Sequence, residues 1–182
     1  PLFNRAISGN YPPASTIKPF IGLLGLKEGE IDWNTTIEDK GFFQLNEDGR
    51  KYRGWKEDGH GKVNLSKSII VSSDVFFYKL AVQLTVDRIA TFLKQFGFGL
   101  KTGVDLYAEG EGILPDRKWK LGAIGESWFV GDTLNIGIGQ GYISCTPLQL
   151  AVAISSIATR GKIYKPKVVA KIGEEHIEKE LI

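Results

Sequence analysis

The chain has 182 residues, of which 42% are hydrophobic and 24% are charged, and its formal net charge is +2. This length fits one domain with a hydrophobic core, and so small a net charge argues against nucleic acid as a partner. The single cysteine, Cys145, excludes an internal disulfide, and no apolar run approaches the ~20 residues that span a bilayer.

The first predicted element is a buried helix that begins within PASTIKPF, residues 13–20. Ser15 or Thr16 can cap this helix, and Pro19 falls in its first turn, where a missing N–H does no harm. Apolar residues cover most of the circumference that follows, so the helix is expected at the centre of the fold. Short strands are predicted around residues 41–45 and 50–55, in a polar region broken by glycines.

Helices are predicted through much of the remaining chain. Asn64 caps a short helix over 65–71, an apolar helical pattern covers 75–84, and Thr85 starts a helix that Gly97 or Gly99 ends. Residues 100–135 are expected to be rich in loops. The clearest helix starts at Pro147, and 162–180 is expected to form a strand or a hairpin turning at Gly173. The four tryptophans are interpreted as partly buried core residues: Trp33, Trp55, Trp119 and Trp128.

The pair Ser15 and Lys18 carries the first indication of chemistry. Residues three apart on a helix share a face, so the lysine amine can reach the serine hydroxyl. A serine nucleophile needs a base beside it, and burial favours the neutral lysine that could serve as one. Taken alone the spacing is weak, because a capping serine followed by a lysine whose amine reaches solvent would look the same.

A second candidate motif, Ser72-Ser73-Asp74, lies between two predicted helices. A Ser-x-x-Lys motif followed by Ser-x-Asn or Ser-x-Asp is typical of a class of serine enzymes with a third motif, Lys-Thr-Gly. Polar residues at a break between apolar helices can equally be helix caps.

Four stretches together resemble the transpeptidase domain of penicillin-binding proteins: NRAISGNYPPASTIKPF, GHGKVNLSKSIIVSSDVFFYKLA, FGFGLKTGVDL and GDTLNIGIGQGYISCTPLQLA. The resemblance runs from about Leu2 to Val169 and is greatest to the elongation-specific D,D-transpeptidases of Gram-negative rods. It implies an α/β (α+β) fold like that of the serine β-lactamases, with an antiparallel sheet flanked by helices. Residues 1–182 would be a truncated transpeptidase domain, because the strand with the third motif is expected beyond residue 182.

The resemblance also assigns roles to single residues. Ser15 matches the acyl-ester nucleophile, Lys18 matches its general base, and Ser72 matches a serine that shuttles protons. Asp74 matches the third position of the second motif and is expected at the substrate-binding site. A carboxylate near Lys18 would raise the lysine pKa, which opposes the role of a base.

Gly139 and Gln140 belong to a Gly-Gln-Gly segment that lies near the active site of the family, and we expect both to contribute to substrate binding. Close backbone packing is the alternative interpretation of these glycines. Lys101-Thr102-Gly103 spells the third motif but precedes this segment, whereas the family has it downstream on a strand. We therefore interpret it as a coincidence in a loop.

Some members of the subgroup bind zinc through two aspartates, a histidine and a cysteine around the second motif. The aligned positions here are Asp39, Gly54, His60 and Ser73. Glycine offers no ligand and serine is a poor one for zinc, so we predict no metal and no cofactor.

The whole protein would cross-link peptidoglycan stem peptides through an acyl-enzyme on Ser15, and penicillin and other β-lactams would acylate the same serine. The resemblance places this domain in the periplasm, within a protein anchored in the inner membrane, beside the cell-elongation machinery of the membrane. The truncated chain itself is expected to be inactive. A serine β-lactamase or β-lactam-sensor domain is the alternative. A relative without catalytic activity is a further alternative. The presence of Ser15, Lys18 and Ser72 argues against it.

Overall fold

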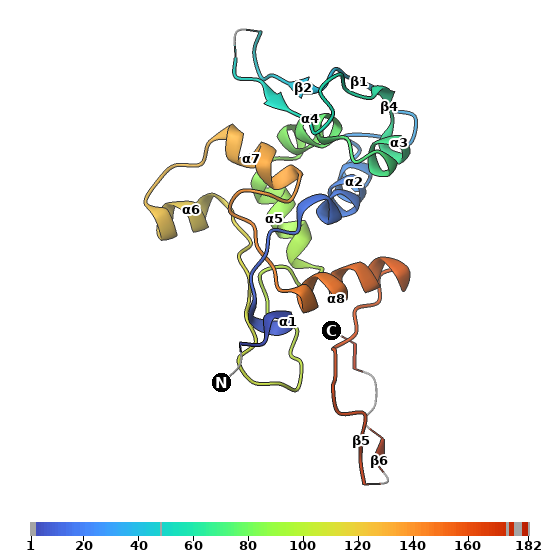
Figure 1. Ribbon diagram of the computed structural model, residues 1–182, viewed down its shortest axis with the longest axis vertical. Helices are drawn as coiled ribbons and strands as arrows, with labels where there is room; N and C mark the ends of the chain where they lie inside the picture. Colours follow the sequence, from blue (N-terminus) through green and yellow to red (C-terminus); the bar gives the residue numbers. More distant parts are fainter. Residues whose placement is uncertain (1–2, 48, 174, 177–179, 182) are drawn as a thin grey trace. The chain divides into compact units, whose positions relative to one another are not determined.

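The computed structural model describes residues 3–47, 49–173, 175–176 and 180–181 (Figure 1). The chain forms two compact units, each made of separate stretches of sequence. Unit 1 comprises 1–13, 91–114 and 143–182, and unit 2 comprises 14–90 and 115–142. Within the described residues the sheets are three antiparallel pairs of short strands, so the fold is mixed but mainly helical.

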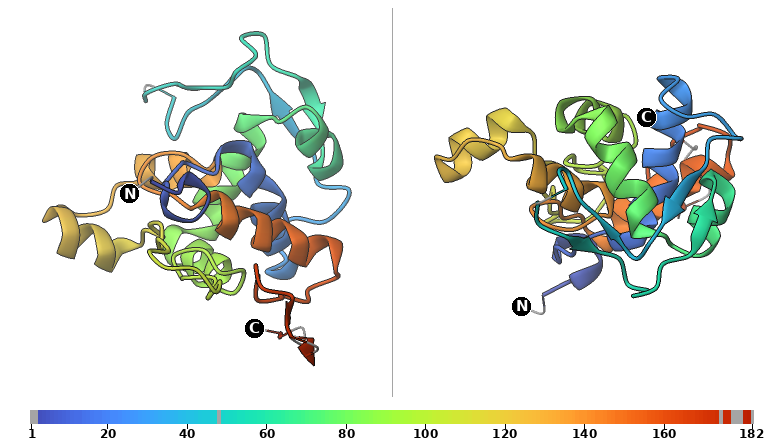
Figure 2. Two further views of the ribbon diagram at one scale, coloured as in Figure 1. Left: turned by 60° about the horizontal axis from the view of Figure 1, so that its bottom comes forward. Right: turned by 90° about the horizontal axis from the view of Figure 1, so that it is seen from above.

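The core of unit 2 is formed by α4 (Asp74–Leu84), which packs against α2 (Lys18–Lys27) and α7 (Val130–Gly137) (Figures 1 and 2). Close approach depends on Gly137, since a Cβ there would lie 2.5 Å from that of Ala81. Burying one large apolar side chain, such as a leucine or a phenylalanine, contributes ~1.5–3 kcal/mol, so burial of such residues stabilises the packing of the three helices. The fully buried apolar residues of this core include Phe20, Ile21, Phe77, Ala81, Leu84 and Leu134.

The predicted buried helix exists, but it starts later than its polar residues indicate. A 3-10 turn, η1 (Ala14–Ile17), contains Ser15 and Thr16, and α2 follows it. The N-cap of α2 is Ile17, which makes no side-chain cap, so the predicted cap at Ser15 or Thr16 is wrong. Pro19 lies in the first turn as expected, where its missing N–H leaves no bond unmade.

The strands of unit 2 form two small hairpin-like pairs. β2 (Phe42–Phe43) pairs with β3 (Tyr52–Arg53), which confirms the strands predicted there. β1 (Ile37–Asp39) pairs with β4 (Gly61–Val63), placing Asp39 opposite Gly61. The second pair leads directly into α3 (Leu65–Ile70), whose first turn is capped by Asn64 as predicted.

Two helices occupy part of the region that was expected to be mainly loop. α6 (Arg117–Ile124) begins with an Asp116 side chain that accepts from the Trp119 N–H, and α7 follows at Val130. Lys120 of α6 is buried and its ammonium lies 2.7 Å from Asp132 of α7. Lysine side chains are normally exposed, so a buried lysine departs from the pattern by which a helix is recognised in a sequence. The sequence therefore contained no indication of α6, which the ion pair between Lys120 and Asp132 stabilises.

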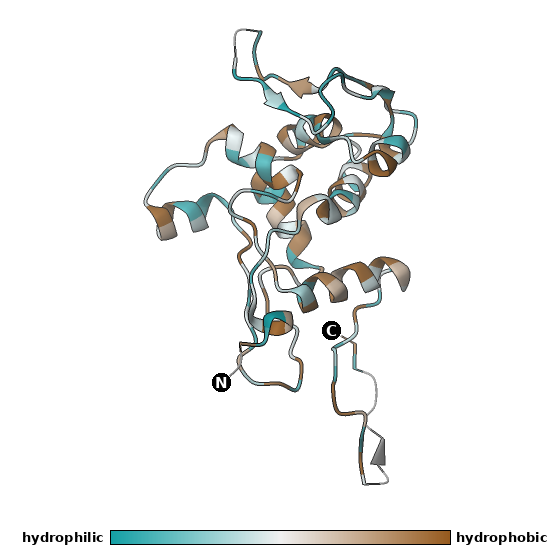
Figure 3. Ribbon diagram, viewed as in Figure 1, coloured by the Kyte–Doolittle hydropathy of each residue, from teal (hydrophilic) through white to brown (hydrophobic). Residues whose placement is uncertain are grey.

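Unit 1 contains α1 (Arg5–Ser8), which packs against α8 (Pro147–Ala158), a largely hydrophobic helix (Figure 3). The capping box of Thr146 and Gln149 starts α8, as the Thr-Pro sequence predicted. α5 (Val86–Lys94) begins in unit 2 and ends in unit 1, and β5 (Lys171–Ile172) and β6 (Glu175–His176) form the predicted hairpin. Among the described residues, no helix is both long and apolar enough to cross a membrane.

Candidate active site

The side chains of Ser15, Ser72 and Lys18 form a continuous chain of hydrogen bonds within unit 2. Ser72 Oγ lies 2.8 Å from Ser15 Oγ, and Lys18 Nζ lies 2.9 Å from Ser72 Oγ. Ser15 belongs to η1, Lys18 opens α2, and Ser72 lies in the turn before α4. Ser15 is exposed whereas Lys18 is buried, so a solvent-accessible hydroxyl is linked to an amine shielded from water.

The ammonium of Lys18 uses all three of its N–H groups on the second motif. It donates to the Ser72 carbonyl at 2.9 Å, to Ser72 Oγ at 2.9 Å and to Asp74 Oδ1 at 2.7 Å. A lysine ammonium has three donors and no acceptor, so these bonds account for its full capacity. The connection from Lys18 to Ser15 therefore runs through Ser72, rather than along the helix face that the two residues were predicted to share.

Two opposing effects set the pKa of Lys18, which lies beside a carboxylate. Burial lowers the pKa of Lys18 below its ordinary value, and the hydrogen bond and charge of Asp74 offset this only in part. Asp74 is also engaged elsewhere, because its Oδ2 accepts from the Trp55 backbone N–H at 3.1 Å. The net lowering of the pKa makes loss of a proton by Lys18 easier than in water.

The backbone is strained on both sides of the Ser15–Ser72 contact. Ser72 has φ +53° and Ala14, next to Ser15, has φ +49°. A left-handed conformation costs a residue other than glycine ~1–2 kcal/mol, so neighbouring contacts must hold these residues in place. Strained residues cluster at functional sites in proteins, which is consistent with an active site here.

Gly139 supports the strained Ala14 by direct backbone contact. The Ala14 N–H donates to the Gly139 carbonyl at 2.8 Å, and a Cβ on Gly139 would lie 2.1 Å from the Ala14 carbonyl oxygen. Only glycine fits this approach, which agrees with the packing interpretation of the glycine-rich segment. Gln140 follows with an exposed side chain.

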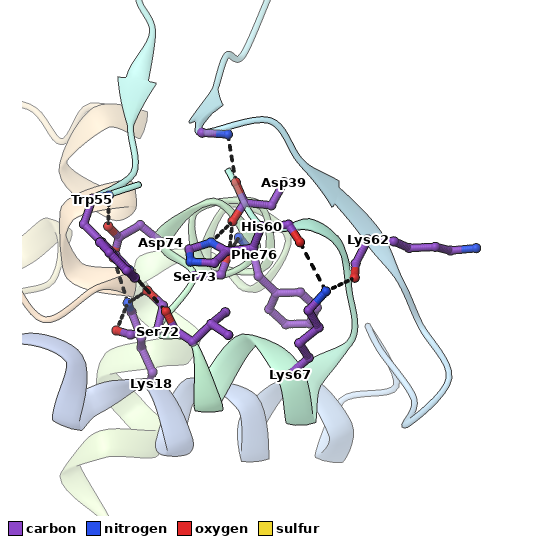
Figure 4. Close-up of polar contacts among 12 residues, drawn as sticks. Lys18, Asp39, Trp55, His60, Lys62, Lys67, Ser72, Ser73, Asp74 and Phe76 are labelled. Atoms are coloured by element: carbon purple, nitrogen blue, oxygen red, sulfur yellow. Dashed lines mark hydrogen bonds and ion pairs between the residues drawn. The ribbon is translucent and has the colours of Figure 1, made fainter. Parts of the chain in front are cut away.

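Trp55 is a site residue that sequence reasoning missed, since it was interpreted as partial core. Its side chain is 66% exposed, and its indole Nε1 donates to the carbonyls of Val71 and Ser72, both at 3.1 Å (Figure 4). The indole thereby fixes the carbonyl group of the strained Ser72, and the backbone N–H of Trp55 binds the Asp74 carboxylate. No sequence signal marks this role, because a loop tryptophan far from the motif gives no spacing to interpret.

The Lys101-Thr102-Gly103 sequence lies outside any strand, as predicted for a chance match. The carboxylate of Glu109 accepts from the backbone N–H groups of Thr102 and Gly103 and from the Thr102 hydroxyl. Lys101 is exposed and lies 3.6 Å from Glu111. The N–H groups of Thr102 and Gly103 are therefore already hydrogen-bonded within a loop of unit 1, so they cannot pair with a substrate as an edge strand would.

The four positions aligned with a zinc site do not provide a set of metal ligands. Asp39 Oδ2 accepts from Ser73 Oγ at 2.5 Å and from His60 Nδ1 at 2.9 Å (Figure 4). Burial by itself would raise the pKa of Asp39, but the hydrogen bonds from Ser73 and His60 outweigh it and lower that pKa. Gly54 adds no donor, and no group of three histidine, cysteine or acidic side chains in the described part of the chain could hold a metal.

A serine hydroxyl linked through a second serine to a buried lysine is an arrangement that can activate the first serine as a nucleophile. Residues 1–181 match the family of the penicillin-binding protein transpeptidase domain, and the chain belongs to this family. A peptidoglycan D,D-transpeptidase MrdA of Acinetobacter baumannii is 48% identical over 169 residues, which is 93% of this chain and 25% of the relative.

Solved structures give the same result. A crystal structure of Pseudomonas aeruginosa PBP2 in complex with WCK 5153 matches with a TM-score of 0.92 and 38% identity, over 100% of this chain and 41% of that one. PBP2 of Helicobacter pylori in complex with MreC matches with a TM-score of 0.89 and 40% identity, over 99% of this chain and 33% of that one. The expected transpeptidase fold is confirmed. The chain spans about a quarter of the length of the curated relative.

Proposed function

We propose that the protein to which this chain belongs is a peptidoglycan D,D-transpeptidase that works through an acyl-enzyme on Ser15. The observation that carries the proposal is the hydrogen-bonded chain from the exposed Ser15 hydroxyl through Ser72 to the buried Lys18. The names of the relatives support the same reaction, since the A. baumannii protein is a peptidoglycan D,D-transpeptidase. Neither the proposal nor its test needs a metal or a cofactor.

Acylation begins with neutral Lys18, whose lowered pKa favours this form. As Ser15 Oγ attacks the carbonyl carbon of the penultimate D-alanine, its proton passes to Ser72 and the Ser72 proton passes to Lys18. The tetrahedral intermediate then collapses and the peptide C–N bond breaks. The departing D-alanine amine receives the proton that Lys18 had accepted, which returns through Ser72. An ester of Ser15 and one free D-alanine remain.

Deacylation repeats these steps with a new nucleophile. An amine from a neighbouring stem peptide loses a proton to the Ser72–Lys18 relay, attacks the ester carbonyl and forms the cross-link while Ser15 regains its proton. A β-lactam enters at the first step, since its strained amide presents a similar carbonyl to Ser15. Its amine stays tethered after the C–N bond opens, which blocks the path of an incoming amine.

The remaining expectations form part of the same proposal. Asp74, Gly139 and Gln140 contribute to the substrate-binding side of the site, Gly139 by allowing the backbone at Ala14 to approach closely. A Lys-[Ser/Thr]-Gly strand of the complete domain completes the site. In this proposal the protein works in the periplasm beside the elongation machinery. The H. pylori PBP2 structure, which is a complex with MreC, supports a protein partner for it.

Mass spectrometry of the full-length protein after incubation with labelled penicillin tests the proposal. The expected result is one adduct, located on the peptide that contains Ser15 and persisting for many minutes. An adduct on another residue would overturn the assignment. Rapid release of hydrolysed penicillin would instead favour a serine β-lactamase.

A further inference from the structure

The middle residue of the second motif, Ser73, is tied to a distant aspartate instead of facing the substrate side of the motif. Ser73 is fully buried, its hydroxyl lies 2.5 Å from Asp39 Oδ2, and it accepts from the Phe76 N–H at 3.3 Å. The hydroxyl therefore caps α4 and at the same time binds a residue 34 positions earlier in the chain. Its neighbours Ser72 and Asp74 both accept hydrogen bonds from the Lys18 ammonium.

Asp39 is itself held from three directions. Besides the Ser73 hydroxyl, it accepts from His60 Nδ1 at 2.9 Å and from the Gly41 backbone N–H at 2.9 Å. Asp39 ends β1 opposite Gly61 of β4, so His60 and Asp39 are brought together by the β1–β4 pairing (Figure 4). A buried carboxylate that accepts three hydrogen bonds is firmly held, because hydrogen bonds to an ionised acceptor are stronger than those between neutral groups.

The Ser72 turn needs such an anchor. Ser72 sits at φ +53°, and its hydroxyl must face Lys18 and Ser15 at once. On its own the turn would relax toward an ordinary conformation, since the left-handed one is unfavourable for serine. The Ser72 hydroxyl would then no longer lie within hydrogen-bonding distance of both Lys18 Nζ and Ser15 Oγ.

We propose that Asp39 is a positioning residue for acyl transfer. Together with His60 and Ser73 it forms a hydrogen-bonded clamp, the Asp39 clamp, which fixes the Ser72 turn without a metal ion. This inference rests on the proposed function, because the acylation rate is its principal measure. In this proposal Asp39 acts on the Ser72 turn through Ser73 and makes no contact with the substrate.

The test compares two aspartates of unit 2 in the full-length protein. Asp39→Asn weakens the clamp, because an amide presents a donor where the carboxylate only accepts. Asp32→Asn is the matched control. Asp32 also accepts three bonds, from the Asn34 N–H, the Thr35 N–H and the Thr35 hydroxyl, but it lies in an exposed turn that makes no contact with the motif.

Stopped-flow labelling with a fluorescent penicillin gives the acylation rate constant, the noncovalent affinity and the labelled fraction separately. We expect Asp39→Asn to slow the acylation rate constant by ~10–10²-fold, because misplacement of reacting groups by about 1 Å can cost ~10²-fold. Noncovalent affinity should be unchanged, and Asp32→Asn should match the wild type. A purely structural role would instead lower the labelled fraction at an unchanged rate constant, and that result would overturn the proposal.

Ser73→Ala provides a second route if Asp39→Asn folds poorly. It should slow acylation to a similar extent, and the double variant should be no slower than the slower single one, because both changes act through the same hydrogen bond between Ser73 and Asp39. Independent, multiplying effects would count against the clamp. Failure of the wild type to label at Ser15 would refute the proposed function instead, so the two failures are distinguishable.

Discussion

Lys18 Nζ lies 2.7 Å from Asp74 Oδ1, and yet the pKa of Lys18 is lowered. An ion pair so short would ordinarily raise the pKa of the lysine. Burial prevails here because the ammonium is shielded from water. A carboxylate thus lies beside Lys18 while the pKa of the lysine stays below its ordinary value.

Removing the nucleophile should abolish labelling and leave the fold intact. Ser15→Ala in the full-length protein is expected to form no penicillin adduct, because no other hydroxyl occupies the exposed end of the relay. Ser15 is exposed, so the free energy of unfolding should change by no more than ~0.5 kcal/mol. Gel fluorescence and thermal melting check both statements, and an adduct that survives the change contradicts the assignment.

Lys18 should matter for acylation and Lys101 should not. Lys18→Ala is expected to slow acylation by ~10²–10⁴-fold, the usual contribution of a general base. Lys18→Arg should be similarly slow, since a guanidinium keeps a positive charge but does not lose its proton. Lys101→Ala is the control, because Lys101 is exposed in a loop. Equal losses at the two lysines would restore Lys101-Thr102-Gly103 as the third motif.

The pH profile of acylation should respond to Asp74. The rate rises with pH as Lys18 loses its proton, so the acidic limb of the profile reports the pKa of Lys18. Asp74 raises that pKa through a hydrogen bond and its charge. Asp74→Asn removes the charge, so the pKa of Lys18 falls further and the limb moves to lower pH. Asp32→Asn should leave the limb in place, and a shift of the Asp74→Asn limb to higher pH would contradict the assignment of Lys18 as the base.

Zinc should stabilise this chain only after two ligands are supplied. The wild-type chain is expected to keep its melting temperature when zinc is added. The double variant Gly54→Asp and Ser73→Cys adds a carboxylate and a thiolate to Asp39 and His60, which makes a four-ligand set. A Cβ at Gly54 meets its neighbours no closer than 3.6 Å, so the backbone there accepts a side chain. Its melting temperature should rise with zinc and fall again with a chelator. Zinc-dependent stabilisation of the wild type would show that the clamp is a metal site.

The chain of residues 1–182 should react poorly with penicillin by itself. Within its described residues, the Lys-Thr-Gly sequence is a loop whose N–H groups are bound to Glu109. Without an oxyanion donor from a third-motif strand, acylation should slow by at least ~10²–10³-fold relative to the full-length protein. Adduct mass after incubation with excess penicillin measures this. Rapid, stoichiometric acylation would mean that the site is complete within this sequence.

The sequence by itself determined the elements whose signals are local. Asn64 and Thr146 each bind an N–H group three residues later, so their caps could be recognised from neighbouring residues alone. The family was indicated by the four stretches of sequence taken together, because each matches the family in composition and all occur in the family's order. The caps depend on residues a few positions apart, where chain geometry leaves few arrangements.

Only the tertiary structure decided how the candidate site is connected. Lys18 reaches Ser15 through Ser72, which lies 54 residues from the lysine, and Ser73 is anchored by Asp39, which lies 34 residues away. Trp55 was wrongly expected in the core, and nothing in the sequence indicated that Lys120 is buried, because an exposed tryptophan and a lysine buried in an ion pair both depart from average behaviour. Contacts across such distances depend on how α2, α4 and the β1–β4 pair pack. Packing is a property of the folded chain that local spacing does not encode.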